Sequence, residues 1–248
     1  MVIDYPRLIT SVWGDKSTGK SHLALTFPSP IVAIEIGETG LGDLVPKFEA
    51  APYNKKIDFQ AIRVPTLEPG TAHLRRLLDK FAEVYLKAVN SEDVRTIIID
   101  SMSRLWAHIY TVKLDEVRSK RKEGAKESQL DWVAANDYHE QIVNVTGLNP
   151  RINLVMLHRH KEAYARQEGG GFGPSGEIEA RDYKGMENLV QVMIRTNYKD
   201  MIVPGSTPIK REKKFVHTIE KCRFNKPLEG WEEPMLDYDK LAKLVWEK

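Results

Sequence analysis

The stretch "SVWGDKSTGKSHLAL", residues 11–25, decides the fold of this chain. From Gly14 onward it has the spacing G-x-x-x-x-G-K-S. The apolar residues before the first glycine predict a strand, and the residues after the second glycine predict a helix that ends at Pro28. The sequence therefore predicts a glycine-rich turn that joins a buried strand to a helix.

This spacing is the P-loop pattern, and its alternative is a glycine-rich surface turn without a ligand. Glycines let the backbone approach a phosphate chain, while successive N–H groups and the positive end of the following helix face its charge. We expect Lys20 to neutralise the terminal phosphates and Ser21 to give its hydroxyl to Mg²⁺. The residues expected to bind the nucleotide are Gly14, Asp15, Lys16, Ser17, Thr18, Gly19, Lys20, Ser21 and His22.

Size and composition are those of an ordinary globular chain. Its 248 residues are 42% hydrophobic and 29% charged, with a formal net charge of +2, so any basic contact surface must be local. The single cysteine, Cys222, excludes an internal disulfide and a cysteine-rich zinc site. We expect one domain over residues 1–248 that stays in the cytosol, with no membrane span and no membrane partner.

Short apolar runs alternate with helical patterns along the chain. The segments PIVAIEIGETG, RTIIIDS and INLVMLHRH predict buried strands, and residues 74–88 repeat apolar side chains at helical spacing. A closing helix follows Asp237, which is expected to cap it. This alternation predicts an α/β fold with a mostly parallel twisted sheet and helices on both faces.

Ligands of such sheets bind at the carboxyl ends of the strands. Asp100 ends the strand TIIID, where its carboxylate can hold Mg²⁺ opposite Ser21, directly or through water. His158 ends the strand INLVML, and it either senses a phosphate or is a polar strand terminus.

These residues resemble the RecA-like P-loop ATPases, most closely the small, core-only RecA-like proteins of bacteriophages that are linked to single-strand annealing and recombination. The matching pieces, in order, are GDKSTGKS, IEIGETG, IIIDSMSRLW, LVMLHRH and IEKCRF, and they span most of the chain. The resemblance implies ATP with Mg²⁺, ATP hydrolysis stimulated by DNA, and single-stranded DNA as partner. It also implies a homo-oligomer, ring or filament, encoded by a phage and located in the cytoplasm of the bacterial host.

In RecA-like enzymes an acid just after the second strand orients the attacking water. The resemblance assigns this role to Glu38. The family usually spaces its two acids by one residue, whereas two residues separate Glu35 from Glu38 here, so Glu35 stays an alternative or caps a turn.

A Lys-x-Arg pair, Lys221 and Arg223, lies on a later strand, where the period of two projects both side chains from one face. By resemblance this pair reaches the γ-phosphate bound by the neighbouring subunit, so that active sites are completed between subunits. The alternative is a salt-bridged strand surface. The same resemblance gives His158 the task of linking the nucleotide to a DNA-binding loop.

Residues 159–185 are rich in glycine and lack apolar periodicity, which predicts a long loop. By resemblance this is the DNA loop, although a surface excursion is the alternative. Its cations and one aromatic residue suit sequence-tolerant binding of a single strand. They are Arg159, His160, Lys161, Arg166, Phe172, Arg181 and Lys184. The charged runs 118–127 and 209–215 are either further DNA contacts or solvated surface.

Two other classes of function fit the same motifs. One is a nucleotide-gated DNA-binding module with negligible hydrolysis, which the unusual spacing of the acids favours. The other is a different P-loop NTPase, either a kinase or a motor.

Overall fold

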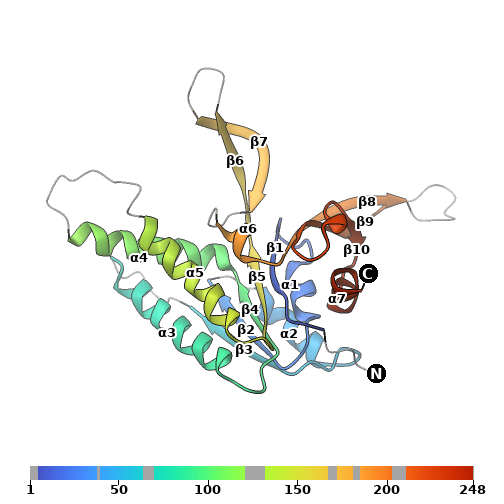
Figure 1. Cartoon of the computed structure of the whole chain (residues 1–248), viewed down its shortest axis with the longest axis horizontal. Helices are drawn as coiled ribbons and strands as arrows, with labels where there is room; N and C mark the ends of the chain where they lie inside the picture. Colours follow the sequence, from blue (N-terminus) through green and yellow to red (C-terminus); the bar gives the residue numbers. More distant parts are fainter. Residues whose placement is uncertain are drawn as a thin grey trace.

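The computed structural model describes residues 5–37, 40–63, 70–120, 132–166, 172–180, 185–202 and 211–247. Within these ranges, one sheet has the strand order β10-β9-β8-β1-β5-β4-β2-β3 (Figure 1). Its strands are β1 (Ile9–Gly14), β2 (Ile31–Ile36), β3 (Ile57–Ile62), β4 (Thr96–Asp100), β5 (Asn153–His158), β8 (Val192–Ile202), β9 (Arg211–Cys222) and β10 (Glu232–Pro234). The strands from β8 to β3 pair in parallel, and β9 pairs antiparallel with both of its neighbours, β8 and β10. The predicted α/β fold with a mostly parallel sheet is confirmed.

Helices cover both faces of this sheet (Figure 1). One layer holds α3 (Ala72–Val89), α4 (Met102–Ser119) and α5 (Val133–Gly147), and the other holds α1 (Lys20–Leu25), α2 (Leu41–Glu49) and α7 (Tyr238–Trp246). The three central residues of β4 are apolar because both faces of the strand are covered: Ile97 and Ile99 pack into the first layer, and Ile98 packs into the second.

Two local predictions are also confirmed. The apolar repeat at residues 74–88 lies within α3. Asp237 caps α7, since its carboxylate accepts a hydrogen bond from the Lys240 backbone N–H at 2.8 Å.

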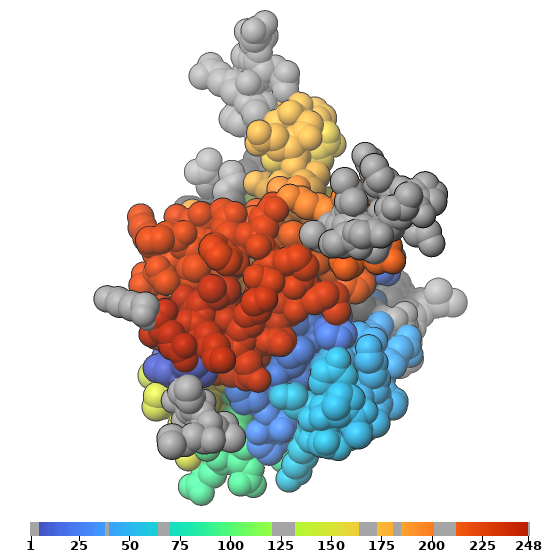
Figure 2. Space-filling view, turned by 90° about the vertical axis from the view of Figure 1, so that its right-hand side faces the viewer, coloured from blue at the N-terminus to red at the C-terminus, as the bar shows by residue number. Residues whose placement is uncertain are grey.

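In Figure 2 the C-terminal residues, coloured red, form one continuous surface beside the blue N-terminal part of the chain.

The predicted long loop at residues 159–185 is wrong in its secondary structure. Strands β6 (His160–Arg166) and β7 (Phe172–Ala180) pair into an antiparallel hairpin that projects from the sheet, and the short helix α6 (Met186–Leu189) follows (Figure 1). Residues 174–179 of β7 are exposed, so this part of the hairpin packs against no core. Its strands therefore lack the alternation of apolar and polar residues that identifies a half-buried strand.

In the part of the chain that the structure describes, no helix has both the length and the apolar character needed to cross a bilayer.

Candidate functional site

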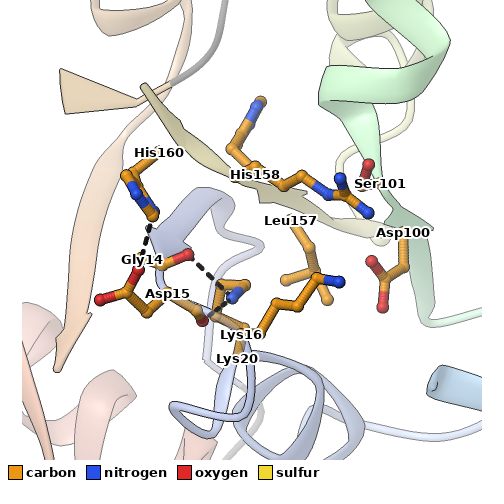
Figure 3. Close-up of a pocket in the computed structure, with 10 residues that line it drawn as sticks. Gly14, Asp15, Lys16, Lys20, Asp100, Ser101, Leu157, His158 and His160 are labelled. Atoms are coloured by element: carbon orange, nitrogen blue, oxygen red, sulfur yellow. Dashed lines mark hydrogen bonds and ion pairs between the residues drawn. The ribbon is translucent and has the colours of Figure 1, made fainter. Parts of the chain in front are cut away.

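A pocket with a volume of about 540 Å³ opens at the carboxyl ends of the central strands (Figure 3). It gathers the turn after β1, the end of β4 and the end of β5, which are far apart in the sequence. Its lining residues are Gly14, Asp15, Lys16, Lys20, Asp100, Ser101, Leu157, His158, Arg159 and His160. This is the edge of the sheet at which the sequence places a ligand site.

The two glycines of the turn sit where other residues would not fit. Gly14 has φ of 145°, and a Cβ built on it would lie 2.2 Å from the carbonyl oxygen of Thr196 on β8. Gly19 has φ of 93°, in the left-handed region. The turn therefore depends on glycine both for its backbone angles and for its close approach to β8.

The ammonium group of Lys20 is folded back onto this turn (Figure 3). Its Nζ donates to the carbonyl oxygen of Gly14 at 3.0 Å and also to that of Asp15. A phosphate oxygen is a stronger acceptor than a neutral carbonyl. A phosphate chain in the pocket could therefore take over this donor.

Ser21 and Asp100 meet at the same pocket, as the sequence predicts. Ser21 Oγ donates to Asp100 Oδ2 at 3.0 Å, and Asp100 is only 9% exposed. A hydroxyl and a carboxylate are oxygen ligands of the kind that Mg²⁺ prefers, and Mg²⁺ usually takes few protein ligands. Within the described residues, no group of three or more His, Cys, Asp or Glu side chains forms a metal site. The pair therefore fits Mg²⁺ held together with phosphate and water.

The Glu35 carboxylate is held by hydrogen bonds at the start of α2 and by an ion pair with Arg63. The buried carboxylate accepts hydrogen bonds from the backbone N–H groups of residues 40–42 at 3.0–3.2 Å, at the start of α2. Arg63 Nη2 lies 2.7 Å from its other oxygen. Glu35 thus caps a helix, which is one of the alternatives that the sequence leaves open. The other acid, Glu38, lies outside the described residues.

His158 is fully buried at the end of β5 although it borders the pocket. Burial, with a smaller effect of His139 on α5, lowers its pKa to about 3. The imidazole is therefore neutral at neutral pH. It can contact a ligand only as a neutral hydrogen-bonding group and not as a cation.

His160, at the start of the hairpin, pairs directly with the phosphate loop. Its Nδ1 lies 2.9 Å from Asp15 Oδ1 (Figure 3). Its neighbour Arg159, which the sequence places among the DNA-loop cations, lines the pocket and donates its backbone N–H to Ser103 Oγ at 3.0 Å. The sequence gives no signal for the pairing of His160 with Asp15, because the two residues are far apart along the chain.

Lys221 and Arg223 lie on one side of the chain, flanking the buried Cys222 at the end of β9. Lys221 Nζ donates to the backbone carbonyl of Glu187, and Arg223 Nη2 donates to that of Asn188 at 2.7 Å. Both acceptors belong to α6, which follows the hairpin. The partners described for this pair are thus backbone carbonyls of their own chain and not the carboxylates of a salt-bridged surface.

Two further predicted binding residues, Thr18 and His22, make structural contacts within and beside the turn. Thr18 is buried, and its hydroxyl donates to the Asp15 carbonyl at 2.8 Å. The ring of His22 packs edge-on against Phe48 at 5.0 Å between centroids, and burial lowers its pKa. The His22 side chain therefore contributes to packing between α1 and α2.

Two aromatic residues beside the turn were missed by the sequence analysis. Tyr198 of β8 donates its hydroxyl to the carbonyl of Ser17, and the ring of Phe215 of β9 packs against Gly19. Tyr198 belongs to no motif, and Phe215 enters the sequence analysis only as the last residue of the charged run 209–215. Only the pairing of β8 with β9 and of β8 with β1 brings them to the turn.

Comparisons with known proteins agree with this architecture. A family model described as "AAA domain" matches residues 8–221. No curated protein matches the chain.

Two solved structures are similar in fold. The crystal structure of the RadB recombinase aligns with a TM-score of 0.52 at 16% identity, over 93% of this chain and 87% of that chain. A prototypical ATPase from the type III secretion system of pathogenic bacteria aligns with a TM-score of 0.50 at 14% identity, over 79% of this chain and 57% of that one. At these identities the likeness concerns the fold alone, and it confirms the predicted RecA-like P-loop architecture.

Proposed function

Because this chain belongs to the AAA domain family, we propose that it binds ATP with Mg²⁺, hydrolyses it, and acts as an oligomer on single-stranded DNA. This activity is of the kind found in the phage annealing and recombination proteins that the sequence resembles. The reaction would transfer the γ-phosphoryl group of ATP to water, giving ADP and phosphate.

One observation carries the proposal: Ser21 makes a 3.0 Å hydrogen bond to Asp100, which lines the pocket together with Lys20. The three side chains come from the P-loop and from the end of β4, and they supply a cation and two oxygen ligands at one place. Mg²⁺ held by Ser21 and Asp100 would supply positive charge to the phosphate oxygens. A surface turn without a ligand would have no reason to gather this set.

The chain's own groups would do the rest of the chemistry. The Lys20 ammonium would leave the carbonyls of Gly14 and Asp15 and donate to a phosphate oxygen. We assign Glu38 to the attacking water, whose proton its carboxylate would accept, because Glu35 is already engaged by α2 and Arg63.

Lys221 and Arg223 are proposed to act across a subunit interface. They lie apart from the residues that line their own chain's pocket. Two cations at the nucleotide of a neighbour would stabilise the charge that develops on the γ-phosphate oxygens. An isolated protomer is then expected to hydrolyse ATP slowly.

We assign single-stranded DNA to the hairpin β6–β7. The hairpin projects from the sheet, and His160 ties its first strand to Asp15 of the phosphate loop. A rearrangement of the phosphate loop when ATP binds or is hydrolysed can therefore move the hairpin through the contact between Asp15 and His160. Arg181 and Lys184, which the sequence analysis adds to this surface, and residues 121–127 of the run 118–127 lie outside the described residues.

Sedimentation with a labelled oligonucleotide, with and without ATP and Mg²⁺, tests the proposal. We expect ATP to change both the size of the assembly and its affinity for the oligonucleotide. The same oligonucleotide in duplex form is the control and should bind more weakly. Equal sedimentation and equal DNA affinity in both conditions would contradict the proposal.

A second candidate is a nucleotide-gated DNA-binding module that hydrolyses ATP negligibly. The use of Glu35 as a helix cap favours it, since one of the two candidate acids is not free for catalysis. Phosphate release measured with and without single-stranded DNA distinguishes the two, because strong stimulation by DNA excludes the passive module.

A further inference from the structure

We infer that Tyr198 and Phe215 form the seat for the base of the nucleotide whose phosphates the P-loop holds. This inference rests on the proposed function and extends it to a site for the nucleoside. The two residues are directly opposite each other in the β8–β9 ladder, with ring centroids 5.1 Å apart. They form one continuous aromatic surface.

This aromatic surface borders the phosphate loop itself. The Tyr198 hydroxyl donates to the Ser17 carbonyl, and a Cβ built on Gly19 would come within 3.3 Å of Phe215 Cγ. The rings are thus in contact with two residues of the P-loop.

The surface also lies on the flank where a nucleoside would leave the loop. In the sheet, β1 has β5 on one side and β8 on the other. The pocket, with Asp100 and His158, opens on the β5 side, whereas Tyr198 and Phe215 come from the β8 side. A nucleotide with its terminal phosphate beside Asp100 and its phosphate chain along the loop has its nucleoside directed to the aromatic pair.

The surface is accessible to a ring from outside. Tyr198 is 43% exposed, and Phe215 beside it is half-buried, so the outer side of the Tyr198 ring is open to a ligand. Aromatic rings stack on the faces of nucleobases, and this interaction tolerates any base because each has a π-face.

The other explanation is that the two rings only clamp the P-loop in shape. The two explanations predict different ligand dependence. If the rings only hold the P-loop in shape, removing them weakens the affinity of every ligand that binds through phosphate. If they bind the base, removing them weakens only ligands that carry a base. Inorganic tripolyphosphate, which has the phosphate chain of ATP and no nucleoside, separates them.

The experiment measures the affinities of ATP and of tripolyphosphate, each with Mg²⁺, by calorimetry on the full chain. We expect Phe215→Leu and Tyr198→Leu each to weaken ATP about tenfold while tripolyphosphate changes by less than about twofold. Tyr198→Phe, which keeps the ring and removes the hydroxyl, should retain more ATP affinity than Tyr198→Leu. The matched control is Trp231→Leu, another half-exposed aromatic residue outside the surface, which should leave both affinities as they are.

Equal loss of affinity for ATP and tripolyphosphate would contradict the base site and mean that the rings only hold the P-loop in shape. Unchanged ATP affinity in both leucine variants would also contradict the base site. If the variants weaken an oligonucleotide but not ATP, the surface stacks strand bases and the inference is wrong. Failure of the proposed function has a different signature: the wild-type protein would bind neither ATP nor tripolyphosphate, which overturns both proposals.

Discussion

Ser21 Oγ donates a hydrogen bond to Asp100 Oδ2 at 3.0 Å across 79 positions of the sequence. Parallel pairing of β1 with β5 and of β5 with β4 brings the two residues to one edge of the sheet. A hydroxyl and a carboxylate that face each other beside Lys20 form a preorganised place for a cation and phosphate.

Replacing Lys20 with alanine is expected to reduce ATP turnover at least about a hundredfold, because an ammonium group that stabilises transferring phosphate is lost. The measurement is phosphate release in the presence of single-stranded DNA. Lys80→Ala, which removes an exposed lysine of α3 that pairs with Glu83 at 3.0 Å, is the matched control and should keep the wild-type rate. Normal turnover by Lys20→Ala would contradict the P-loop assignment.

The two candidate acids, Glu35 within β2 and Glu38 shortly after it, should separate into a structural and a catalytic residue. Glu35→Gln removes a charged acceptor of three backbone N–H groups and should lower the free energy of unfolding by about 1–3 kcal/mol, measured in urea. Glu38→Gln should leave stability nearly unchanged and abolish turnover while ATP still binds. The reverse pattern would make Glu35 the catalytic acid.

Whether Lys221 and Arg223 act across a subunit interface can be tested by mixing two inactive variants of this protein. Lys221→Ala with Arg223→Ala leaves the P-loop intact but removes the cations for the neighbour, whereas Asp100→Asn damages the chain's own pocket and keeps those cations. We expect each protein to be nearly inactive alone and the mixture to recover part of the wild-type turnover, because mixed interfaces contain one complete site. No recovery, with mixed oligomers demonstrated by sedimentation, would mean that Lys221 and Arg223 act within their own chain.

Stability is expected to fall in mild acid. Burial lowers the pKa of His139 and His158 to about 3 and that of His217 to about 4, from the usual 6.5. The unfolded chain takes up protons below pH 6.5 and the folded chain does not, so the unfolding free energy falls as the pH drops from 6.5 towards 4. Each histidine contributes up to about 1.4 kcal/mol per pH unit. Urea unfolding at pH 7, 6 and 5 measures this dependence. His139→Phe removes one of the three histidines and should make the unfolding free energy change less with pH. A stability that is constant between pH 7 and 5 would contradict it.

The contact between His160 and Asp15 is expected to carry the effect of ATP to the DNA site. His160→Ala and Asp15→Ala should each reduce the ATP-dependent change in oligonucleotide affinity, by about two- to fivefold for a partly exposed pair. The double variant should add little further, since both substitutions break one contact. Fluorescence anisotropy with a labelled oligonucleotide gives the affinity of the wild type and of each variant with and without ATP. Fully additive losses would mean that the two residues act independently.

Features with a local cause could be predicted from the sequence. The P-loop depends on its own glycines, α3 on an apolar repeat, and the start of α7 on Asp237. Asp100 could be placed opposite Ser21 because the end of a parallel strand fixes where its last side chain lies. The fold class follows from the alternation of apolar runs with helical patterns.

Features that depend on long-range contacts were missed. The hairpin β6–β7 is held by pairing between its own strands, and residues 174–179 of β7 are exposed, so its sequence resembles a loop. The approach of Tyr198 and Phe215 to the P-loop and the pairing of His160 with Asp15 result from strand order. The engagement of Glu35 by the start of α2 likewise depends on how the chain turns after β2.

The hydrogen bonds from Lys221 and Arg223 to α6 set a condition on assembly. A subunit that lends these two cations to its neighbour must first give up two internal bonds at the foot of the hairpin. If the pair acts across the interface as proposed, part of the free energy of association is used to loosen α6, the segment that follows the proposed DNA-binding hairpin. By reciprocity, nucleic acid that holds α6 in another position would release the cations and favour the next subunit.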